Sequence, residues 1–170
     1  DTIQALRYYQ MAADNGHKLA QFKTGSYYEL GTDGKQDYTL AAKYYQMAAA
    51  QDYMPAQFNL AILYDNGLGV EADFAKAAQL YRRAADKGNP DAQYAFGAMT
   101  ENGRGLERNL KTASYYYQLA AEQGHINAQI NLGVIYVNGE SDIKDYIKAH
   151  MWFNIAAAQG NKTARDFRDR

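Results

Sequence analysis

The chain has 170 residues, enough to bury a hydrophobic core, and its 18 basic and 19 acidic side chains give a net charge of −1. This balance provides no overall field that would attract nucleic acid or an anionic membrane surface. The absence of cysteine excludes disulfides, thiolate zinc sites and cysteine nucleophiles.

The sequence repeats with a period of 36 residues. An Ala-Gln pair recurs at this spacing, and a glycine follows each alanine after eleven residues: Ala20, Ala56, Ala92, Ala128 and then Gly31, Gly67, Gly103, Gly139. A fixed period in this range indicates stacked supersecondary units. We therefore expect one repeat array over 1–170. It comprises a half repeat at 1–16, full repeats at 17–52, 53–88, 89–124 and 125–160, and at 161–170 the start of a further repeat or a cap.

Each repeat is predicted to form two helices. In chain order the predicted helices span 2–15, 18–30, 38–51, 54–66, 74–87, 90–102, 110–123, 126–138 and 146–159. The first helix of a repeat ends at the glycine of unit position 15, counted from the first residue of the repeat, and this glycine is expected to take the left-handed conformation. The second begins after an N-cap residue at position 21: Asp37, Asp73, Asn109 or Asp145, with Asp1 equivalent. It ends at position 36, where Gly16, Gly88, Gly124 and Gly160 stand and Asp52 is the exception.

Short helices of this kind are marginal alone, so packing must stabilise them. Alanine at position 4, the residue at position 8 (Leu60, Phe96 or Leu132) and the tyrosine at position 12 form an expected core stripe. Small residues at position 9 allow close approach of the second helix, whose bulky pair at positions 28 and 29 fills the space above. These small residues are Gly25, Ala61, Gly97 and Gly133. Each repeat then leaves a side that only the next repeat can cover.

The repeat pattern resembles a known family. Repeat 53–88 carries A-x-x-x-L-G-x-x-Y-x-x-G-x-G-V-x-x-D-x-x-K-A-x-x-x-Y-x-x-A-A almost completely, through Ala56, Leu60, Tyr64, Gly67, Gly69, Val70, Asp73, Lys76, Ala77, Tyr81, Ala84 and Ala85, with Ala61 in place of the first glycine. This pattern is similar to the Sel1-like repeat, a relative of the tetratricopeptide repeat, and the resemblance covers essentially the whole chain. Departures fall at Asp33, Gly34, Thr100 and Ser141, and they put turn geometry in question.

The resemblance implies a right-handed α/α superhelix whose concave face binds proteins or peptides, within a larger bacterial protein. A periplasmic or secreted location is favoured over a cytoplasmic one by the habit of the family. A cysteine-rich branch is associated with penicillin-like compounds, which leaves β-lactam or peptidoglycan-related binding or hydrolysis as a minor alternative. That branch is a poor analogy for a chain without cysteine.

If the first helices line the concave side, as in tetratricopeptide arrays, the residues opposite the core stripe face a partner. They stand at positions 6, 10 and 13, which share one helix face. They are Phe22, Ser26, Glu29; Phe58, Ile62, Asp65; Tyr94, Ala98, Glu101; and Ile130, Val134, Val137. We hypothesise a groove that binds a segment with apolar anchors and at least one basic residue. The acidic residues of position 13 (Glu29, Asp65 and Glu101), here called the acidic row, would orient this segment.

The apolar residues of position 6 and the acidic row each have a second interpretation. Position 6 is apolar in all four repeats, and such regularity is typical of packing between neighbouring first helices. The acidic row is equally well explained as an ordinary solvated face. For the whole chain, the alternative function is a structural spacer or an array that self-associates through its ends, with the activity in a domain elsewhere.

No catalytic, metal or cofactor site is predicted. His17 and His125 share position 1 of repeats 108 residues apart, His150 lies in a second helix, and each is expected at the surface. The Gly-x-Gly turns at 67–69 and 103–105 lack the Lys-Ser/Thr of a phosphate loop. The sequence has neither an apolar run of about 18 to 20 residues nor a signal segment after Asp1, so we expect a soluble chain without membrane insertion.

Overall fold

The computed structural model describes residues 2–32, 36–139 and 143–169, and regular structure within these ranges is helical, with no strand. The chain divides into two units, Asp1–Lys87 and Gly88–Arg170. The first contains α1 (Thr2–Asp14), α2 (Lys18–Leu30), α3 (Tyr38–Ala50), α4 (Met54–Asn66) and α5 (Phe74–Ala85). The second contains α6 (Pro90–Asn102), α7 (Leu110–Glu122), α8 (Ile126–Asn138), α9 (Tyr146–Ala158) and α10 (Lys162–Arg168).

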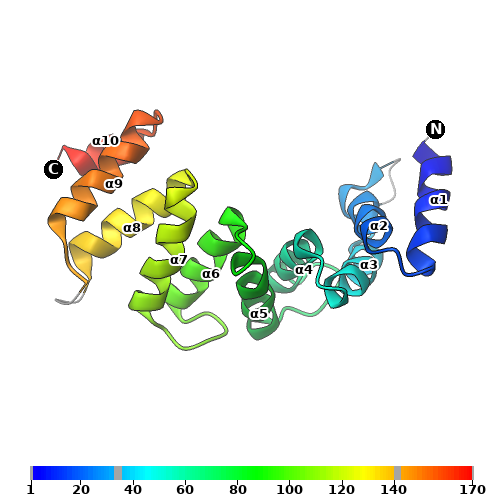
Figure 1. Cartoon of the computed structure of the whole chain (residues 1–170). Helices are drawn as coiled ribbons and strands as arrows, with labels where there is room; N and C mark the ends of the chain where they lie inside the picture. Colours follow the sequence, from blue (N-terminus) through cyan, green and yellow to red (C-terminus); the bar gives the residue numbers. More distant parts are fainter. Residues whose placement is uncertain (1, 33–35, 140–142, 170) are drawn as a thin grey trace. The chain divides into compact units, whose positions relative to one another are not determined.

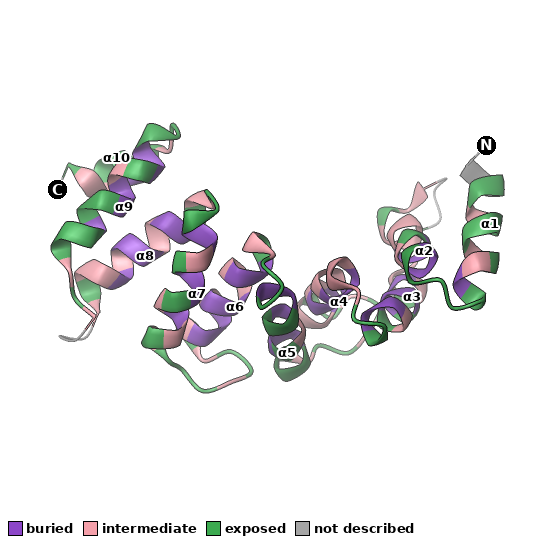
Figure 2. Ribbon diagram, in the orientation of Figure 1, coloured by how far each residue is buried: buried purple, intermediate pink, exposed green. Residues whose placement is uncertain are grey.

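Within each unit, every helix packs against the next one along the chain (Figure 1). This order confirms the expected all-α fold of helix-turn-helix repeats. Buried residues gather on the faces that neighbouring helices share, while the outer faces are exposed (Figure 2). Among the described residues, no helix has both the length and the apolar character needed to cross a membrane.

The predicted N-caps of the second helices are confirmed. The side chain at position 21 accepts a hydrogen bond from the backbone N–H three residues later, at 2.9 Å or 3.0 Å in all four repeats. Each of these oxygens satisfies one N–H that the helix itself leaves without a partner. Asp1, the expected equivalent in the half repeat, lies outside the described residues.

The aspartate and lysine of the repeat pattern bind each other. Lys76 Nζ lies 3.0 Å from Asp73 and 5.4 Å from the centre of the Tyr64 ring. The backbone N–H and the ammonium of Lys76 together lower the pKa of the Asp73 carboxyl. The same set recurs as Asp145, Lys148 and Tyr136. The D-x-x-K spacing therefore ties the start of a second helix to the end of the first.

The glycines that end the first helices behave as expected in three repeats. Gly31, Gly67 and Gly103 are left-handed, with φ between 63° and 66°. Gly139 is extended instead, with φ −64° and ψ 169°, so the expectation is wrong for the last repeat. The turn that follows has Ser141 in place of Gly69 and Gly105, but Asp33 stands at the same position in repeat 17–52, where Gly31 stays left-handed, so this substitution alone does not explain the extended Gly139. Ser141 itself, with Asp33 and Gly34, lies outside the described residues.

A close approach between the two helices of a repeat explains the small residues at position 9. A Cβ added to Gly97 would lie 2.8 Å from the Tyr117 ring, and one added to Gly25 would lie 2.7 Å from the Tyr45 ring. Both rings are fully buried. The prediction that a small residue at position 9 lets a bulky residue of the second helix pack against it is therefore confirmed. The tyrosines of position 12 are only half-buried, because their hydroxyls reach the rim of the helix pair, where Gln10 and Gln46 donate to Tyr28 and Tyr64.

Hydrogen bonds of a buried glutamine amide join neighbouring repeats and were not predicted. Gln21 is buried; its Oε1 accepts from Gln51 Nε2 at 2.8 Å, and its own Nε2 donates to the carbonyl of Ala13 in the preceding repeat at 3.1 Å. The last full repeat has the same arrangement in Gln159, Gln129 and Ala121. Because buried amides are costly unless paired, these bonds fix the register between adjacent repeats.

Repeat 53–88 has a charged variant of this junction. Lys87 replaces the donor glutamine, and its Nζ contacts the backbone oxygen of Asp52 at 2.6 Å and the carboxylate at 2.5 Å. Gln57 and Arg83 also donate to this carboxylate, and the three donors, Lys87 foremost, hold the pKa of Asp52 at about 2. Asp52 has the positive φ of 60° that glycine takes at this position in the other repeats, although it is the exception in sequence. The buried Oε1 of Gln57 is left without a partner.

Thr24 stands at core position 8 and brings a buried hydroxyl that finds no hydrogen-bond partner. We expect Thr24→Val to raise the free energy of unfolding by about 1 kcal/mol, because the isosteric change removes an unsatisfied polar group. The matched control is Thr100→Val, since the buried Thr100 hydroxyl donates to the Phe96 carbonyl at 2.7 Å. Urea denaturation followed by circular dichroism measures the free energy of unfolding of both variants. Stabilisation by Thr100→Val of the same size would contradict the assignment.

The last helix has a charged face. Ala164, at position 4, is fully buried as in every repeat, and Phe167 stacks on Phe153 with ring centres 5.1 Å apart. Positions 5 and 8, which carry glutamine and a core residue in the full repeats, are Arg165 and Arg168 here.

Candidate protein-binding surface

The apolar residues of position 6 are half-buried in all four repeats. Phe22 contacts the Tyr45 ring of its own repeat at 5.7 Å between centres and the Tyr53 ring of the next repeat at 5.4 Å. Tyr94 lies likewise against Tyr117 at 5.7 Å and stacks on His125 at 4.5 Å. Position 6 therefore belongs to the packing between repeats, which agrees with the second interpretation above.

The other two members of the group show the same behaviour. Phe58 lies 5.9 Å from the Tyr81 ring, and Ile130 packs against the buried cluster of Ala156, Ala157 and Ala164. The residues of position 10 are half-buried as well: Ser26, Ile62, Ala98 and Val134. The residues of positions 6 and 10, all apolar except Ser26, are thus partly exposed along the first helices of each unit, and we call them the apolar strip.

Two carboxylates of the acidic row, Glu29 and Glu101, accept hydrogen bonds from buried tyrosines. The Tyr45 hydroxyl donates to Glu29 Oε2, and Asn59 of the next repeat donates to both the Tyr45 hydroxyl at 3.0 Å and Glu29 Oε2 at 3.3 Å. Burial of the ring, followed by the bond to Glu29, raises the pKa of Tyr45. We call this set of carboxylate, tyrosine and asparagine a triad.

A second triad occupies the same positions 72 residues later. The Tyr117 hydroxyl donates to Glu101 Oε2 at 2.7 Å, and Asn131 donates to the Tyr117 hydroxyl at 3.2 Å. Glu29 and Glu101 remain half-buried rather than fully solvated, so an ordinary solvated face does not describe these two carboxylates. Both stand three residues after the position-10 residue of the same helix, and therefore on the same face as the apolar strip.

The triad tyrosines predict how the protein responds to alkali. Because the pKa values of Tyr45 and Tyr117 are raised in the folded chain above the ordinary value near 10, the stability from burying the neutral phenols is complete below about pH 10. It is lost as the pH rises beyond that value, since the unfolded phenols ionise first. We expect two tyrosines to form tyrosinate only as the helices unfold. Tyrosinate absorbance and circular dichroism, recorded together during an alkaline titration, show whether these two tyrosines ionise at the pH at which the helices unfold.

The control is the double variant Tyr45→Phe and Tyr117→Phe, in which absorbance from the remaining phenols should no longer show this late step. If the late step persisted, the two triads would not be its source.

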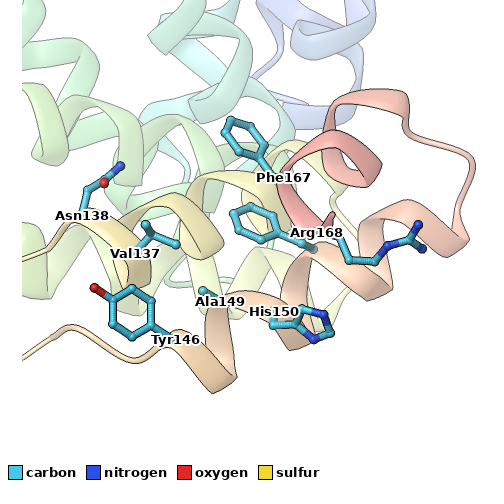
Figure 3. A pocket seen from close by; sticks show the side chains of 8 residues that line it. Val137, Asn138, Tyr146, Ala149, His150, Phe167 and Arg168 are labelled. Atoms are coloured by element: carbon cyan, nitrogen blue, oxygen red, sulfur yellow. The ribbon is translucent and has the colours of Figure 1, made fainter. Parts of the chain in front are cut away.

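The last repeat replaces the whole triad by apolar side chains. Val137, Phe153 and Phe167 stand where the others have the acid, the tyrosine and the asparagine. Here a cavity of about 510 Å³ opens between α8, α9 and α10. Val137 and Tyr146 lie at one side of it, and His150 and Arg168 lie at the other (Figure 3). Most of the cavity surface is apolar. The charge of Arg168 at its edge is balanced by Asp169, at 2.7 Å.

His125 is not the surface side chain that we expected. Its Nδ1 accepts from the Ala128 N–H at 3.1 Å, its Nε2 lies 3.5 Å from Asp91, and its ring stacks on Tyr94. It caps α8 because position 1 precedes a first helix, where a side-chain acceptor is favourable. His17 and His150 are exposed, and within the described residues no group of three or more His, Asp or Glu side chains is placed to hold a metal ion.

The sequence predicted the surface residues of positions 6, 10 and 13, but it did not predict the triads or the cavity. The signal was present in the repeats themselves. Position 13 is acidic wherever position 29 is tyrosine, and it is valine in the one repeat where position 29 is phenylalanine, namely Val137 with Phe153. This matched change predicts contact between the two positions.

A sequence model of the Sel1 repeat matches the chain five times, at residues 1–17, 18–53, 55–89, 90–125 and 126–161. The structure is similar to that of a protective antigen present in uropathogenic Escherichia coli strains, described as displaying an SLR fold. The TM-score is 0.86 at 36% identity, covering 94% of this chain and 34% of that one. The chain thus spans about a third of that relative. No match was found among curated proteins.

A Sel1 repeat protein from Oxalobacter formigenes is similar too, with a TM-score of 0.81 at 34% identity over 96% of this chain and 67% of that chain. The Helicobacter pylori cysteine rich protein B matches 74% of this chain and 90% of its own, with a TM-score of 0.57 and 23% identity. At that identity the likeness concerns the fold alone.

Proposed function

The chain belongs to the Sel1 repeat family, whose α-solenoids are generally scaffolds for protein–protein interaction rather than enzymes, and from this premise we propose that its first helices hold a peptide segment of a partner. The observation that supports the proposal is the pairing, on one helix face, of a partly exposed apolar strip with carboxylates that are oriented before any partner arrives. A binding surface gains affinity when its polar groups need no further ordering.

Each carboxylate of a triad suits a basic side chain. Glu29 Oε2 is occupied by Tyr45 and Asn59, and a lysine or arginine of the partner would complete the coordination of the carboxylate through a charge-assisted hydrogen bond. The neighbouring apolar strip, with Phe22 and Ser26 in the first full repeat, would receive an aliphatic or aromatic side chain. The preferred partner is therefore an apolar segment that carries at least one basic residue.

Asp65 is the equivalent acid of repeat 53–88 and lies in the same unit as Glu29. Its repeat also has a tyrosine at position 29, Tyr81. In the last repeat Val137 and the cavity beneath it would take an uncharged side chain. Within each unit the proposed surface thus runs along consecutive first helices.

Selection of peptides from a displayed random library on the immobilised chain tests the proposal. We expect enriched peptides to combine apolar residues with lysine or arginine. The double variant Glu29→Gln and Asp65→Asn keeps hydrogen-bond acceptors but removes both charges, and it should weaken binding of a selected peptide about fivefold to tenfold in low salt.

The matched control is Glu71→Gln with Glu107→Gln, which removes two exposed charges outside the first helices. Equal affinities for both double variants would remove the acidic row from the proposal. A library that yields no enriched peptide would favour the structural spacer instead.

A further inference from the structure

Position 11 of the first helix carries a buried aliphatic side chain in the last three full repeats: Leu63, Met99 and Ile135. Ile135 belongs to one hydrophobic cluster with Ala113 and Tyr117, which stand at positions 25 and 29 of the preceding second helix. Leu63 shares a cluster with the equivalent pair of its own preceding helix. At these two junctions, an alanine and an aromatic ring of one repeat are therefore packed with an aliphatic side chain of the next.

The cavity of the last repeat is lined by the residues of these same two positions. Ala149 at position 25 and Phe153 at position 29 form part of its wall, together with Val137 and Tyr146 (Figure 3). The helix that packs against α9 here, α10, ends at Arg168, which is position 8. The cavity of about 510 Å³ thus lies beside the residues that position 11 covers at the other junctions, and it has the size of a ligand pocket.

The repeat pattern that would fill this place breaks off in α10. Asp169 stands at position 9, which is glycine or alanine in all four full repeats, and Arg168 stands at core position 8. In the full repeats the second helix packs so closely that a Cβ added to Gly133 would lie 2.5 Å from the Phe153 ring. An aspartate leaves no room for such a helix, so α10 does not form a helix pair of the repeat kind.

The polar residues at the edge of the cavity have partners within the chain. Arg168 pairs with Asp169 at 2.7 Å, and His150 Nδ1 lies 2.9 Å from the Asn154 amide. Most of the remaining surface is apolar. The group that fits the cavity is therefore uncharged and apolar, since burial of an unpaired charge there would be costly.

Val137 connects the cavity with the proposed peptide-binding surface. It stands at position 13, one repeat after Glu101 of the same unit, and three residues after Val134 of the apolar strip. A carboxylate at this position would face the apolar cavity, and valine replaces it only in this repeat. We propose, on the basis of the proposed function, that the cavity is a pocket for one aliphatic anchor of the bound segment. A leucine, isoleucine or methionine side chain enters it, while a basic residue of the same segment binds Glu101.

Titration with N-acetyl-leucinamide, followed by methyl NMR of Val137 and Ala149, tests the pocket without any peptide. We expect saturable shifts with a dissociation constant on the order of 1 to 10 mM, and at least tenfold weaker binding of N-acetyl-alaninamide, which buries less apolar surface. Val137→Phe fills the cavity and should weaken binding of the leucine compound at least fivefold, and Val137→Leu should weaken it less. The control Ile147→Phe adds a ring on the exposed face of α9 and should leave it unchanged.

A peptide enriched from the displayed library tests the occupant. Its aliphatic residues are replaced by alanine one at a time, and binding is measured to the unaltered chain and to Val137→Phe. We expect one replacement to weaken binding to the unaltered chain at least tenfold, and the same replacement to weaken binding to Val137→Phe less than twofold. Such coupling identifies the peptide residue that lies in the cavity.

The proposal is overturned if N-acetyl-leucinamide leaves the Ala149 methyl unshifted, or if N-acetyl-phenylalaninamide binds more tightly than the leucine compound. Equal effects of every alanine replacement on the two proteins would overturn it too. Coupling at one aliphatic residue, with the helicity of Val137→Phe retained by circular dichroism, supports it. Binding of the leucine compound without any enriched peptide would support the aliphatic pocket and contradict the proposed function, so the two failures are distinguishable.

Discussion

Gly69→Ala is expected to lower the free energy of unfolding by roughly 4 kcal/mol, the largest effect of any single methyl group added to the first unit. A Cβ at Gly69 would overlap the backbone carbonyl of Tyr38, in the first turn of α3. The residue also has φ 68°, which costs a side chain about 1 to 2 kcal/mol. Backbone atoms cannot swing aside as a side chain does, so the α4–α5 turn must detach from α3.

Gly67→Ala is the matched control, because both glycines belong to the same turn and have positive φ. A Cβ at Gly67 would lie 3.4 Å from the Ala72 Cβ, an ordinary contact. This variant should lose only about 1 to 2 kcal/mol, the conformational part of the cost. Urea denaturation of the two proteins gives the difference. Equal losses would mean that the contact with Tyr38 contributes nothing to stability.

Tyr117→Ala is expected to cost about 4 kcal/mol, because the ring is fully buried beneath Gly97 and fills the space between α6 and α7. Tyr117→Phe keeps the ring but leaves the half-buried Glu101 carboxylate without its donor, and it should cost about 1 to 2 kcal/mol. Thermal and urea unfolding of the variants measure these losses.

The last repeat supplies the control. It carries Val137 with Phe153 at the same two positions, so Glu101→Val added to Tyr117→Phe should recover the part of the loss that comes from the carboxylate, while Asn131 still lacks the hydroxyl to which it donates. A double variant no more stable than Tyr117→Phe alone would show that the two positions are not energetically coupled, and the triad would then be a contact without consequence for stability.

Local signals made the helices predictable. Asp37, Asn109 and their equivalents act as N-caps through atoms only three residues away, and the left-handed glycines need no information from elsewhere in the chain. Gly139 departs from its left-handed equivalents and takes an extended conformation. Even there, the end of the helix was placed correctly, at Asn138.

Features that join three helices were harder to predict. Gln21 and Gln129 are polar, so the hydrophobic pattern assigns them to the outside, although both lie in the most buried layer of their repeats. Their burial is tolerated only because a second glutamine and a backbone carbonyl meet them there, and neither is a neighbour in sequence. For position 6 the sequence left two interpretations open, partner binding and packing between repeats, and the ring contacts of Phe22 and Tyr94 agree with the second.

The triads have a consequence for anyone who rebuilds this protein. Asn59 completes the triad of Glu29 and Tyr45 from the far side of the repeat boundary at 52 and 53. A cassette cut at that boundary would carry the acid and the tyrosine away from their asparagine, and it would also divide Gln57 from Asp52. The exchangeable module is therefore displaced from the helix pair. It runs from position 9 of one repeat to position 8 of the next, as in residues 25–60, and grafts joined there keep each triad together and keep Gln57 with Asp52.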